Sequence, residues 1–168
     1  MYVLEVKNIQ STASVHSSVI VPDTTMIWDY AQIRENVVLG ENCIIGRNVY
    51  IGPGVVIGDN CKIQNNALIY EPAVIEDGVF IGPAVVLTND RYPRAINPDG
   101  TRKGATDWIP VGVTLRSGAS VGANSVCIAP VELGEWCAVG ANSVVSKDVP
   151  PREMVTGNPA TSRGQSSY

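Results

Sequence analysis

Aliphatic side chains recur at every sixth position of this chain, with polar and small residues between them. A first run begins at Ile9 and ends at Leu87, and a second run begins at Ile109 and ends at Val145. Neither an amphipathic helix, whose period is about 3.6 residues, nor an alternating strand produces this spacing. A sustained hexapeptide period is the signature of a parallel β-helix. We therefore predict an all-β chain wound as a parallel β-helix.

The residues between the aliphatic positions support a narrow prism with three faces. Four residues after each aliphatic position stands a small or slim side chain, for example Ala31, Cys43 or Val55. One position earlier asparagine is frequent, and asparagine tolerates the left-handed backbone that a tight corner needs. A β-sandwich would instead show turn signals every eight to twelve residues. The corner asparagines are Asn36, Asn42, Asn48, Asn60, Asn66, Asn124 and Asn142.

Three hexads make one triangular coil, so residues eighteen apart should stack on neighbouring coils. The two runs contain enough hexads for about seven triangular coils. Between Leu87 and Ile109 we expect one extended loop, residues 89–108, to leave the prism with about sixteen extra residues. We predict one β-helix domain over residues 1–150. Two prolines then stop the stacking, and residues 151–168 are expected to form a C-terminal turn and a flexible tail.

Composition narrows the choice of partners. The formal charge of −4 argues against a nucleic-acid partner held by phosphate neutralisation. No run of eighteen apolar residues occurs, so no membrane span is expected, and the N-terminus lacks the pattern of a signal peptide. All four cysteines fall on inward-facing positions, which predicts buried free thiols and a cytoplasmic location rather than a disulfide framework. These cysteines are Cys43, Cys61, Cys127 and Cys137.

Several short segments carry a likeness to a known family. The chain ends with VVSKDVP at 144–150 and GNPA at 157–160, and with its repeats this resembles the hexapeptide-repeat acyltransferases, which have a left-handed parallel β-helix. The middle of the chain contains KIQNN at 62–66, Tyr70, EDGVFIGP at 76–83, Thr88-Asn89 and Tyr92-Pro93-Arg94. This block resembles the N-acetyltransferases of nucleotide-linked 3-amino sugars. They act on UDP-linked 2-acetamido-3-amino uronic acids or dTDP-linked 3-amino-3,6-dideoxyhexoses, which serve cell-surface polysaccharide biosynthesis.

The resemblance, which covers about residues 10 to 160, implies a homotrimer of parallel prisms with active sites between subunits. Acetyl-CoA would lie in the groove between neighbouring subunits along the C-terminal coils, and the nucleotide-sugar would enter near the loop. No metal is implied. The expected contacts of acetyl-CoA are Gly122, Ala123, Gly140, Ala141, Lys147, Pro159 and Ala160.

Acetyl transfer to an amine needs an aligned thioester, a free amine and donors for the developing oxyanion. The single histidine, His16, stands about four coils before the loop, and we interpret it as a surface residue. A free amine is already a good nucleophile, so a histidine base is not required. Asn89, at the root of the loop, is the first catalytic candidate. Glu71 lies eighteen residues earlier and is expected to stack beside Asn89, either to hold it or to accept a proton.

Polar, aromatic and cationic residues near the loop are the candidates for substrate binding. Gln64, Asn65 and Asn66 form a polar run at one corner, and Tyr70 and Tyr92 could stack on a pyrimidine. Arg91 and Arg94, with Arg102 and Lys103, place cations on the loop that suit a diphosphate. Trp108 is expected to anchor the loop where the chain returns to the prism.

Other functions of the same prism stay open or are excluded. A zinc-dependent carbonic anhydrase with this fold needs three histidine ligands, and one histidine excludes it. An O-acetyltransferase acting on a sugar hydroxyl is the nearest enzymatic alternative. A non-enzymatic β-helix scaffold is the other alternative, but it would not need the polar run or the cationic loop.

Overall fold

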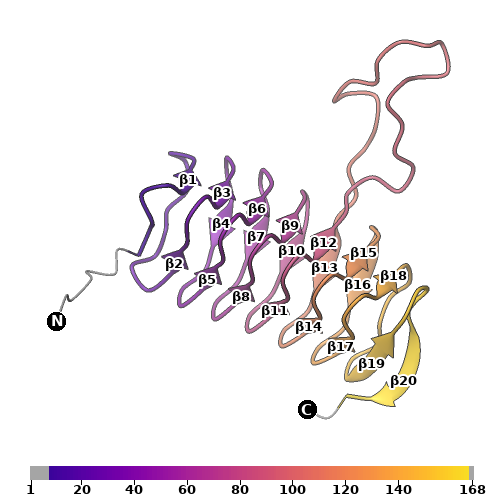
Figure 1. Cartoon of the computed structure of the whole chain (residues 1–168). Coiled ribbons are helices and arrows are strands. Elements are labelled where there is room, and N and C mark those ends of the chain that lie inside the picture. Colours follow the sequence, from indigo (N-terminus) through magenta and orange to yellow (C-terminus); the bar gives the residue numbers. More distant parts are fainter. Residues whose placement is uncertain (1–7, 167–168) are drawn as a thin grey trace.

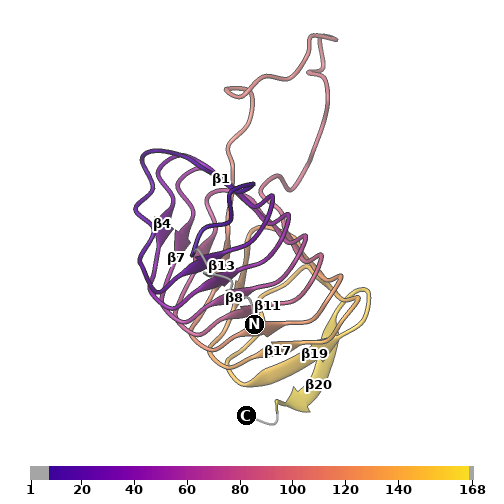
Figure 2. The same cartoon turned by 60° about the vertical axis from the view of Figure 1, so that its left-hand side comes forward.

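The computed structural model describes residues 8–166, which wind as a left-handed parallel β-helix with three flat faces, as predicted (Figures 1 and 2). The first sheet contains β1 (Ser14–Val15), β3 (Gln32–Ile33), β6 (Tyr50–Ile51), β9 (Leu68–Ile69), β12 (Val86–Leu87), β15 (Val126–Cys127) and β18 (Val144–Val145). The second contains β4 (Val38–Leu39), β7 (Val56–Ile57), β10 (Val74–Ile75), β13 (Val113–Leu115) and β16 (Val131–Leu133). The third contains β2 (Met26–Ile27), β5 (Ile44–Ile45), β8 (Lys62–Ile63), β11 (Phe80–Ile81), β14 (Ser120–Val121), β17 (Ala138–Val139), β19 (Glu153–Thr156) and β20 (Thr161–Gln165).

The hexapeptide period places one large aliphatic side chain of each strand inside the prism. In β6, for example, Ile51 is fully buried whereas Tyr50 faces outward, and the same alternation holds for β9 and β12. Neighbouring strands of one sheet are eighteen residues apart, as in the pairing of Gln32 with Tyr50. The stacked interior explains the fold, because each coil buries its apolar face only against the coils beside it.

The corners and the cysteines agree with the sequence pattern. All seven corner asparagines have positive φ angles, between 55° and 63°. The four cysteines are buried free thiols. Cys43 and Cys61 interact across neighbouring coils, and this interaction lowers the pKa of Cys43 and raises that of Cys61.

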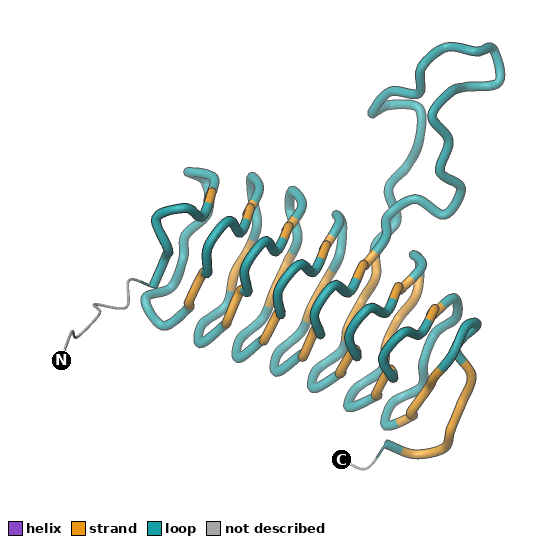
Figure 3. The backbone as a smooth tube through the Cα atoms, viewed as in Figure 1, coloured by secondary structure: helices purple, strands orange, loops and turns teal. Residues whose placement is uncertain are grey.

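The end of the loop differs from the prediction. Ile109 was expected to point into the prism, but it is 85% exposed, and the chain returns at Val113 and Leu115, which are buried. Val74 pairs with Thr114, a separation of 40 residues instead of 18, so the insertion has 22 residues rather than sixteen. The loop therefore interrupts one hexad at the corner between the first and second sheets, and it projects from the prism (Figure 3).

The C-terminal segment also differs from the prediction. Residues 161–165, expected to be part of a flexible tail, form β20, which pairs antiparallel with β19 (Figure 1). The pairing gives β19 a partner on its outer side, where the parallel stack of the third sheet ends. Residues 167–168 of the predicted tail lie outside the described residues. Nowhere in residues 8–166 is there a helix of the length and apolarity that crossing a membrane requires.

Candidate functional site

The root of the loop is held by one backbone hydrogen bond between its two ends and by contacts with the neighbouring coils. The amide of Val111 donates to the carbonyl oxygen of Asn89 at 3.0 Å. Gly112 passes so close to the backbone of Pro72 that a β-carbon there would collide with it. The side-chain hydroxyl of Thr88 accepts from the amide of Ala129 at 3.0 Å. These contacts fix the backbone of Asn89, whereas its carboxamide makes no hydrogen bond with the described residues and is available to a ligand.

A groove of about 330 Å³ opens beside the loop root. It contains the predicted residues Arg91 and Tyr92 together with Trp108, which is half-buried. We call it the loop groove. Its lining residues are Asp90, Arg91, Tyr92, Lys103, Trp108, Ile109, Val111 and Pro130.

The loop cations do not all converge on this groove. Lys103 lies 3.8 Å from the carboxylate of Asp90, and the Arg91 guanidinium lies over the ring of Tyr92 at 5.8 Å from its centroid. Arg94 donates to the carbonyl of its neighbour Pro93 at 2.9 Å. Of the four loop cations, Arg91 and Lys103 line the groove, so a diphosphate there would meet two positive charges.

Glu71 occupies a corner position whose usual partner is missing. At equivalent positions Asp59 and Asp77 accept, at 2.8 Å, a backbone N–H from the residue eighteen positions earlier. Eighteen positions before Glu71 stands Pro53, which has no N–H. The carboxylate atom Oε2 of Glu71 is buried and has no hydrogen-bond partner among residues 8–166.

The predicted contact between Glu71 and Asn89 is not present. The two residues are on neighbouring coils, but Oε2 of Glu71 turns the other way and lies over Gly52, where a β-carbon would collide with it. No hydrogen bond joins Glu71 to Asn89. The physical reason is that a side chain at this corner leans back onto the preceding coil, as the equivalent carboxylates do.

Aromatic residues lie on the outer face of the first sheet, on the N-terminal side of the loop. The rings of Tyr50 and Tyr70 are 5.4 Å apart, in a tilted arrangement. Burial and then the nearby charge of Glu71 raise the pKa of Tyr50. With Tyr30 these tyrosines line a trough of about 460 Å³ on that face. Tyr70 therefore belongs to the trough, whereas Tyr92 belongs to the loop groove.

The polar run at 64–66 lies at a different corner, between the third and first sheets. Oδ1 of Asn65 accepts from the amide of Arg47 at 2.8 Å, and Oδ1 of Asn66 accepts from Nδ2 of Asn48 at 3.1 Å. Asn66 has the left-handed backbone of a corner asparagine. Both asparagines thus stabilise the stacking of coils, and Gln64 is the member of the run without such a contact.

Most residues expected to contact acetyl-CoA follow one corner of the C-terminal coils. Gly122 and Gly140 stack on neighbouring coils, but their N–H groups already donate to Val139 and Val155 at 2.8 Å. Ala123 and Ala141 follow them at the same corner, and Pro159 is exposed. Lys147 and Ala160 line one small cavity of about 120 Å³ between β18 and the C-terminal hairpin.

His16 lies on the surface, as expected, and far from the loop. Its ring nitrogen Nδ1 is 2.9 Å from the hydroxyl of Ser18. It follows β1, whereas Asn89 follows β12, four strands further along the same sheet. At about 4.8 Å per strand this separation is about 19 Å along the prism axis. Within the described residues no cluster of three or more histidine, cysteine or acidic side chains could bind a metal ion.

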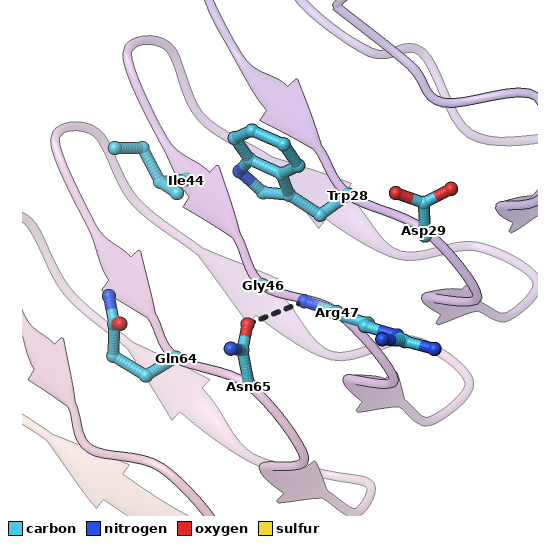
Figure 4. A pocket seen from close by; sticks show the side chains of 7 residues that line it. All are labelled: Trp28, Asp29, Ile44, Gly46, Arg47, Gln64 and Asn65. Atoms are coloured by element: carbon cyan, nitrogen blue, oxygen red, sulfur yellow. Dashed lines mark hydrogen bonds between the residues drawn. The ribbon is translucent and has the colours of Figure 1, made fainter.

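The sequence interpretation missed one further groove, around Trp28 (Figure 4). Position 28 belongs to a row of stacked positions that runs through Gln10, Trp28, Gly46, Gln64 and Gly82. A tryptophan in a row otherwise rich in glycine is the signal that could have drawn attention to it. This groove, the Trp28 groove, has a volume of about 340 Å³ and is lined by Trp28, Asp29, Ile44, Gly46, Arg47, Gln64 and Asn65.

Comparison with known families agrees with this architecture. The family model described as "Bacterial transferase hexapeptide (six repeats)" matches residues 18–53 and 54–89. That described as "Hexapeptide repeat of succinyl-transferase" matches residues 36–71 and 117–147. Together the two cover more than half of the chain, which belongs to the hexapeptide-repeat transferase family.

Among curated proteins, the chain is similar to dTDP-3-amino-3,6-dideoxy-alpha-D-galactopyranose 3-N-acetyltransferase from Aneurinibacillus thermoaerophilus. The two are 48% identical over 50 residues, which span 30% of this chain and 26% of that enzyme. A second similarity, to serine acetyltransferase of Escherichia coli, is 32% over 84 residues, which span 49% of this chain and 30% of that enzyme. The matched stretches thus cover less than a third of either relative.

Two solved structures share the fold. One is a variant of GDP-perosamine N-acetyltransferase from Caulobacter crescentus in complex with CoA and GDP-perosamine. It has a TM-score of 0.65 and 23% identity, and the match covers 91% of this chain and 57% of that one. The other is a variant of AntD, an N-acyltransferase from Bacillus cereus in complex with dTDP and coenzyme A. Its TM-score is 0.61 with 21% identity, and the match covers 95% of this chain and 80% of that one.

Proposed function

We propose that this chain is an acetyl-CoA-dependent N-acetyltransferase that acts on the amino group of a nucleotide-linked amino sugar. The observation that carries the proposal is the loop root, where the carboxamide of Asn89 has no hydrogen-bond partner among the described residues and the single histidine lies about 19 Å away along the prism axis. An amine acceptor suits such a site, because a neutral amine attacks a thioester without the help of a general base. The similarity to a 3-amino-sugar N-acetyltransferase supports the same substrate class.

The reaction requires few groups of the protein. The neutral amine attacks the thioester carbonyl carbon, and the carbonyl oxygen becomes an oxyanion that the carboxamide N–H of Asn89 stabilises. Collapse of the tetrahedral intermediate breaks the carbon–sulfur bond and releases the CoA thiolate. The amine nitrogen loses one proton, which the thiolate takes up. The acceptor that would hold the amine lone pair toward the thioester is the other carboxylate oxygen of Glu71, Oε1, because Oε2 is buried over Gly52.

A histidine base is not part of this proposal. In a trimer of parallel prisms, rotation about the common axis leaves every residue at its own height. His16 of a neighbouring subunit would therefore also remain about 19 Å from Asn89 along that axis. An O-acetyltransferase would need a base to activate its hydroxyl acceptor, which makes it the less favoured alternative.

We propose that the protein is a homotrimer and that its active sites lie between subunits. The corner that carries the loop separates two faces with apolar outer positions. On the second sheet Val38, Val56 and Val74 are 57%, 39% and 39% exposed, and on the first sheet Leu68 and Val86 face outward. A neighbouring prism packed on either face would cover these side chains and place its own residues beside the loop. Light scattering coupled to gel filtration tests the trimer.

The proposed binding of acetyl-CoA rests on the C-terminal coils. Ala123 and Ala141 would contact the pantetheine arm, while Lys147 and Ala160, which share one cavity, would meet the phosphate and adenine end. Since both glycine N–H groups at this corner donate within the prism, we assign Gly122 and Gly140 the role of keeping the surface free of side chains. We place the reaction in the cytoplasm, which supplies acetyl-CoA.

Thiol release from acetyl-CoA tests the activity. The protein is incubated with acetyl-CoA and UDP- or dTDP-linked sugars that carry either an amino or a hydroxyl group at carbon 3. Turnover of an amino sugar at least a hundredfold faster than its hydroxyl counterpart is expected. Faster turnover of the hydroxyl sugar would favour an O-acetyltransferase. No thiol release with any acceptor, from a protein that binds CoA, would refute the proposed function.

A further inference from the structure

The Trp28 groove has an open slot between two side chains that stand two coils apart. Trp28, Gly46 and Gln64 occupy equivalent positions on successive coils, since the amides of Trp28 and Gly46 donate to Ile45 and Ile63. Two strand spacings separate the tryptophan from the glutamine by about 10 Å. The middle residue is a glycine, and a β-carbon there would collide with the backbone of Asn65. The slot is therefore fixed by close backbone packing.

One wall of the slot is aromatic and accessible. The side chain of Trp28 is 40% exposed, and Ile44 extends the apolar surface beside it (Figure 4). A planar ring of about 3.5 Å thickness that stacks on Trp28 would still leave room for polar contacts with Gln64. Base–aromatic stacking is tolerant of ring identity, because every base has a π-face.

The polar side chains around the slot have unused donors. The guanidinium of Arg47 has no carboxylate partner within the described residues and lies 5.2 Å from the ring of Tyr30. The carboxamide of Gln64 has no protein partner there, and Asn65 uses only its oxygen. Asp29 accepts from Thr12 through Oδ1 at 2.7 Å, and Oδ2 is not engaged in that bond. One cation, one carboxylate and two amides thus line the same groove as the aromatic wall. In Figure 4 the Trp28 ring and the Gln64 carboxamide lie on one side of the groove, and the side chains of Asp29 and Arg47 lie on the other.

We infer that the Trp28 groove binds the nucleoside phosphate part of the substrate. The base stacks on Trp28 with its edge toward Gln64, Asp29 accepts from a ribose hydroxyl, and Arg47 pairs with a phosphate oxygen. The volume of about 340 Å³ falls at the lower end of the range for small-molecule sites, which suits a nucleotide better than a whole nucleotide-sugar. The inference rests on the proposed function, because it divides that substrate between two grooves.

The division has a geometric consequence. The Trp28 groove lies at the corner between the third and first sheets, whereas the loop root lies at the corner between the first and second sheets. One nucleotide-sugar can use both when the Trp28 groove of one subunit faces the loop of its neighbour. Gln64, placed at first among the residues near the loop, would then contact the base from the adjacent subunit.

Isothermal titration with UDP, dTDP and GDP, without acyl donor or amine, tests the site. We expect at least one nucleotide to bind the unaltered protein, and Trp28→Leu and Arg47→Gln each to weaken its binding about tenfold or more. Trp28→Phe should retain most of the affinity, because it preserves the stacking surface. Arg163→Gln, which removes a positive charge on β20, is the charge-matched control and should bind normally.

The loop groove provides the competing outcome. If Tyr92→Leu abolishes nucleotide binding while Trp28→Leu and Arg47→Gln leave it intact, the nucleotide lies on the loop and the inference is wrong. Absence of nucleotide binding in the unaltered protein would also overturn it. Failure of the proposed function looks different, because nucleotides would still bind at Trp28 while acetyl-CoA released no thiol with any amino sugar.

Discussion

Replacing Glu71 should separate the stability of this prism from its activity. A buried acceptor without a hydrogen bond costs about 1–3 kcal/mol, and Oε2 of Glu71 is in this condition. Glu71→Ala removes that cost together with a few packing contacts over Gly52. We therefore expect the free energy of unfolding to stay constant or to rise by about 1 kcal/mol. Activity should fall at least tenfold, because the amine loses its acceptor.

Asp77 provides the matched control on the same type of corner. Its carboxylate accepts the amide of Asp59 at 2.8 Å, so Asp77→Ala removes a formed hydrogen bond. We expect a loss of about 0.5–1.5 kcal/mol in stability and no change in turnover. Pro53→Ala makes the complementary change, since it restores an N–H below Glu71. Stability should rise slightly, and turnover should change little, because the new donor bonds the buried Oε2, which the substrate does not reach.

Urea unfolding followed by circular dichroism, at one fixed protein concentration, measures these differences despite the contribution of subunit association. Thiol release measures turnover on the same samples. If Glu71→Ala is destabilised as strongly as Asp77→Ala, the carboxylate has a partner and the reasoning fails. Unchanged turnover in Glu71→Ala would remove the residue from the mechanism.

Five further substitutions test other parts of the structure. Asn89→Ala should lower turnover about 10- to 1000-fold with little change in the CoA dissociation constant, and full activity would exclude the oxyanion role. His16→Ala should leave turnover within about twofold, whereas a hundredfold loss would place a histidine in the site. Ile109→Ala should change stability by less than about 0.5 kcal/mol but Leu115→Ala should cost about 2–5, as urea titration can show. The hydrogen bond from the Arg116 guanidinium lowers the pKa of Glu76 in the folded protein. The ionised Glu76 should therefore stabilise the fold fully above about pH 4.5, and this contribution should vanish as the pH falls through the lowered pKa. Glu76→Gln should flatten the pH dependence of the melting temperature in thermal melts.

The fold was predictable because every hexapeptide repeat shows the same pattern of interior and corner residues. An interior aliphatic such as Ile51 and a corner asparagine such as Asn48 each recur many times, so a single deviation does not obscure the pattern. The buried positions of the cysteines follow from the same register. Here sequence spacing determines the structure directly, because the partner of a residue is almost always eighteen positions away.

The return from the loop was not predictable from spacing, because an insertion destroys the register on which spacing depends. Ile109 satisfies the period of the second run by coincidence, and its side chain is exposed. Gly112 marks the point where the chain returns to the prism, because only a glycine fits against the backbone of Pro72. The strand β20 escaped prediction for a related reason. Its sequence is rich in polar residues, and it is ordered by the free edge of β19, which only the folded prism supplies.

The direction of side chains at the candidate site was beyond the sequence as well. Spacing correctly puts Glu71 and Asn89 on neighbouring coils, but it does not say that a corner carboxylate leans toward the preceding coil. That lean turns an apparent pair into two independent groups, and it leaves Glu71 facing the missing N–H of Pro53. A regular repeat satisfies its own polar groups by symmetry, so a residue that breaks the repeat leaves a group unsatisfied. On this reasoning two residues that break the repeat, Pro53 and the Trp28 that stands in a row rich in glycine, mark the surfaces where the prism binds ligands.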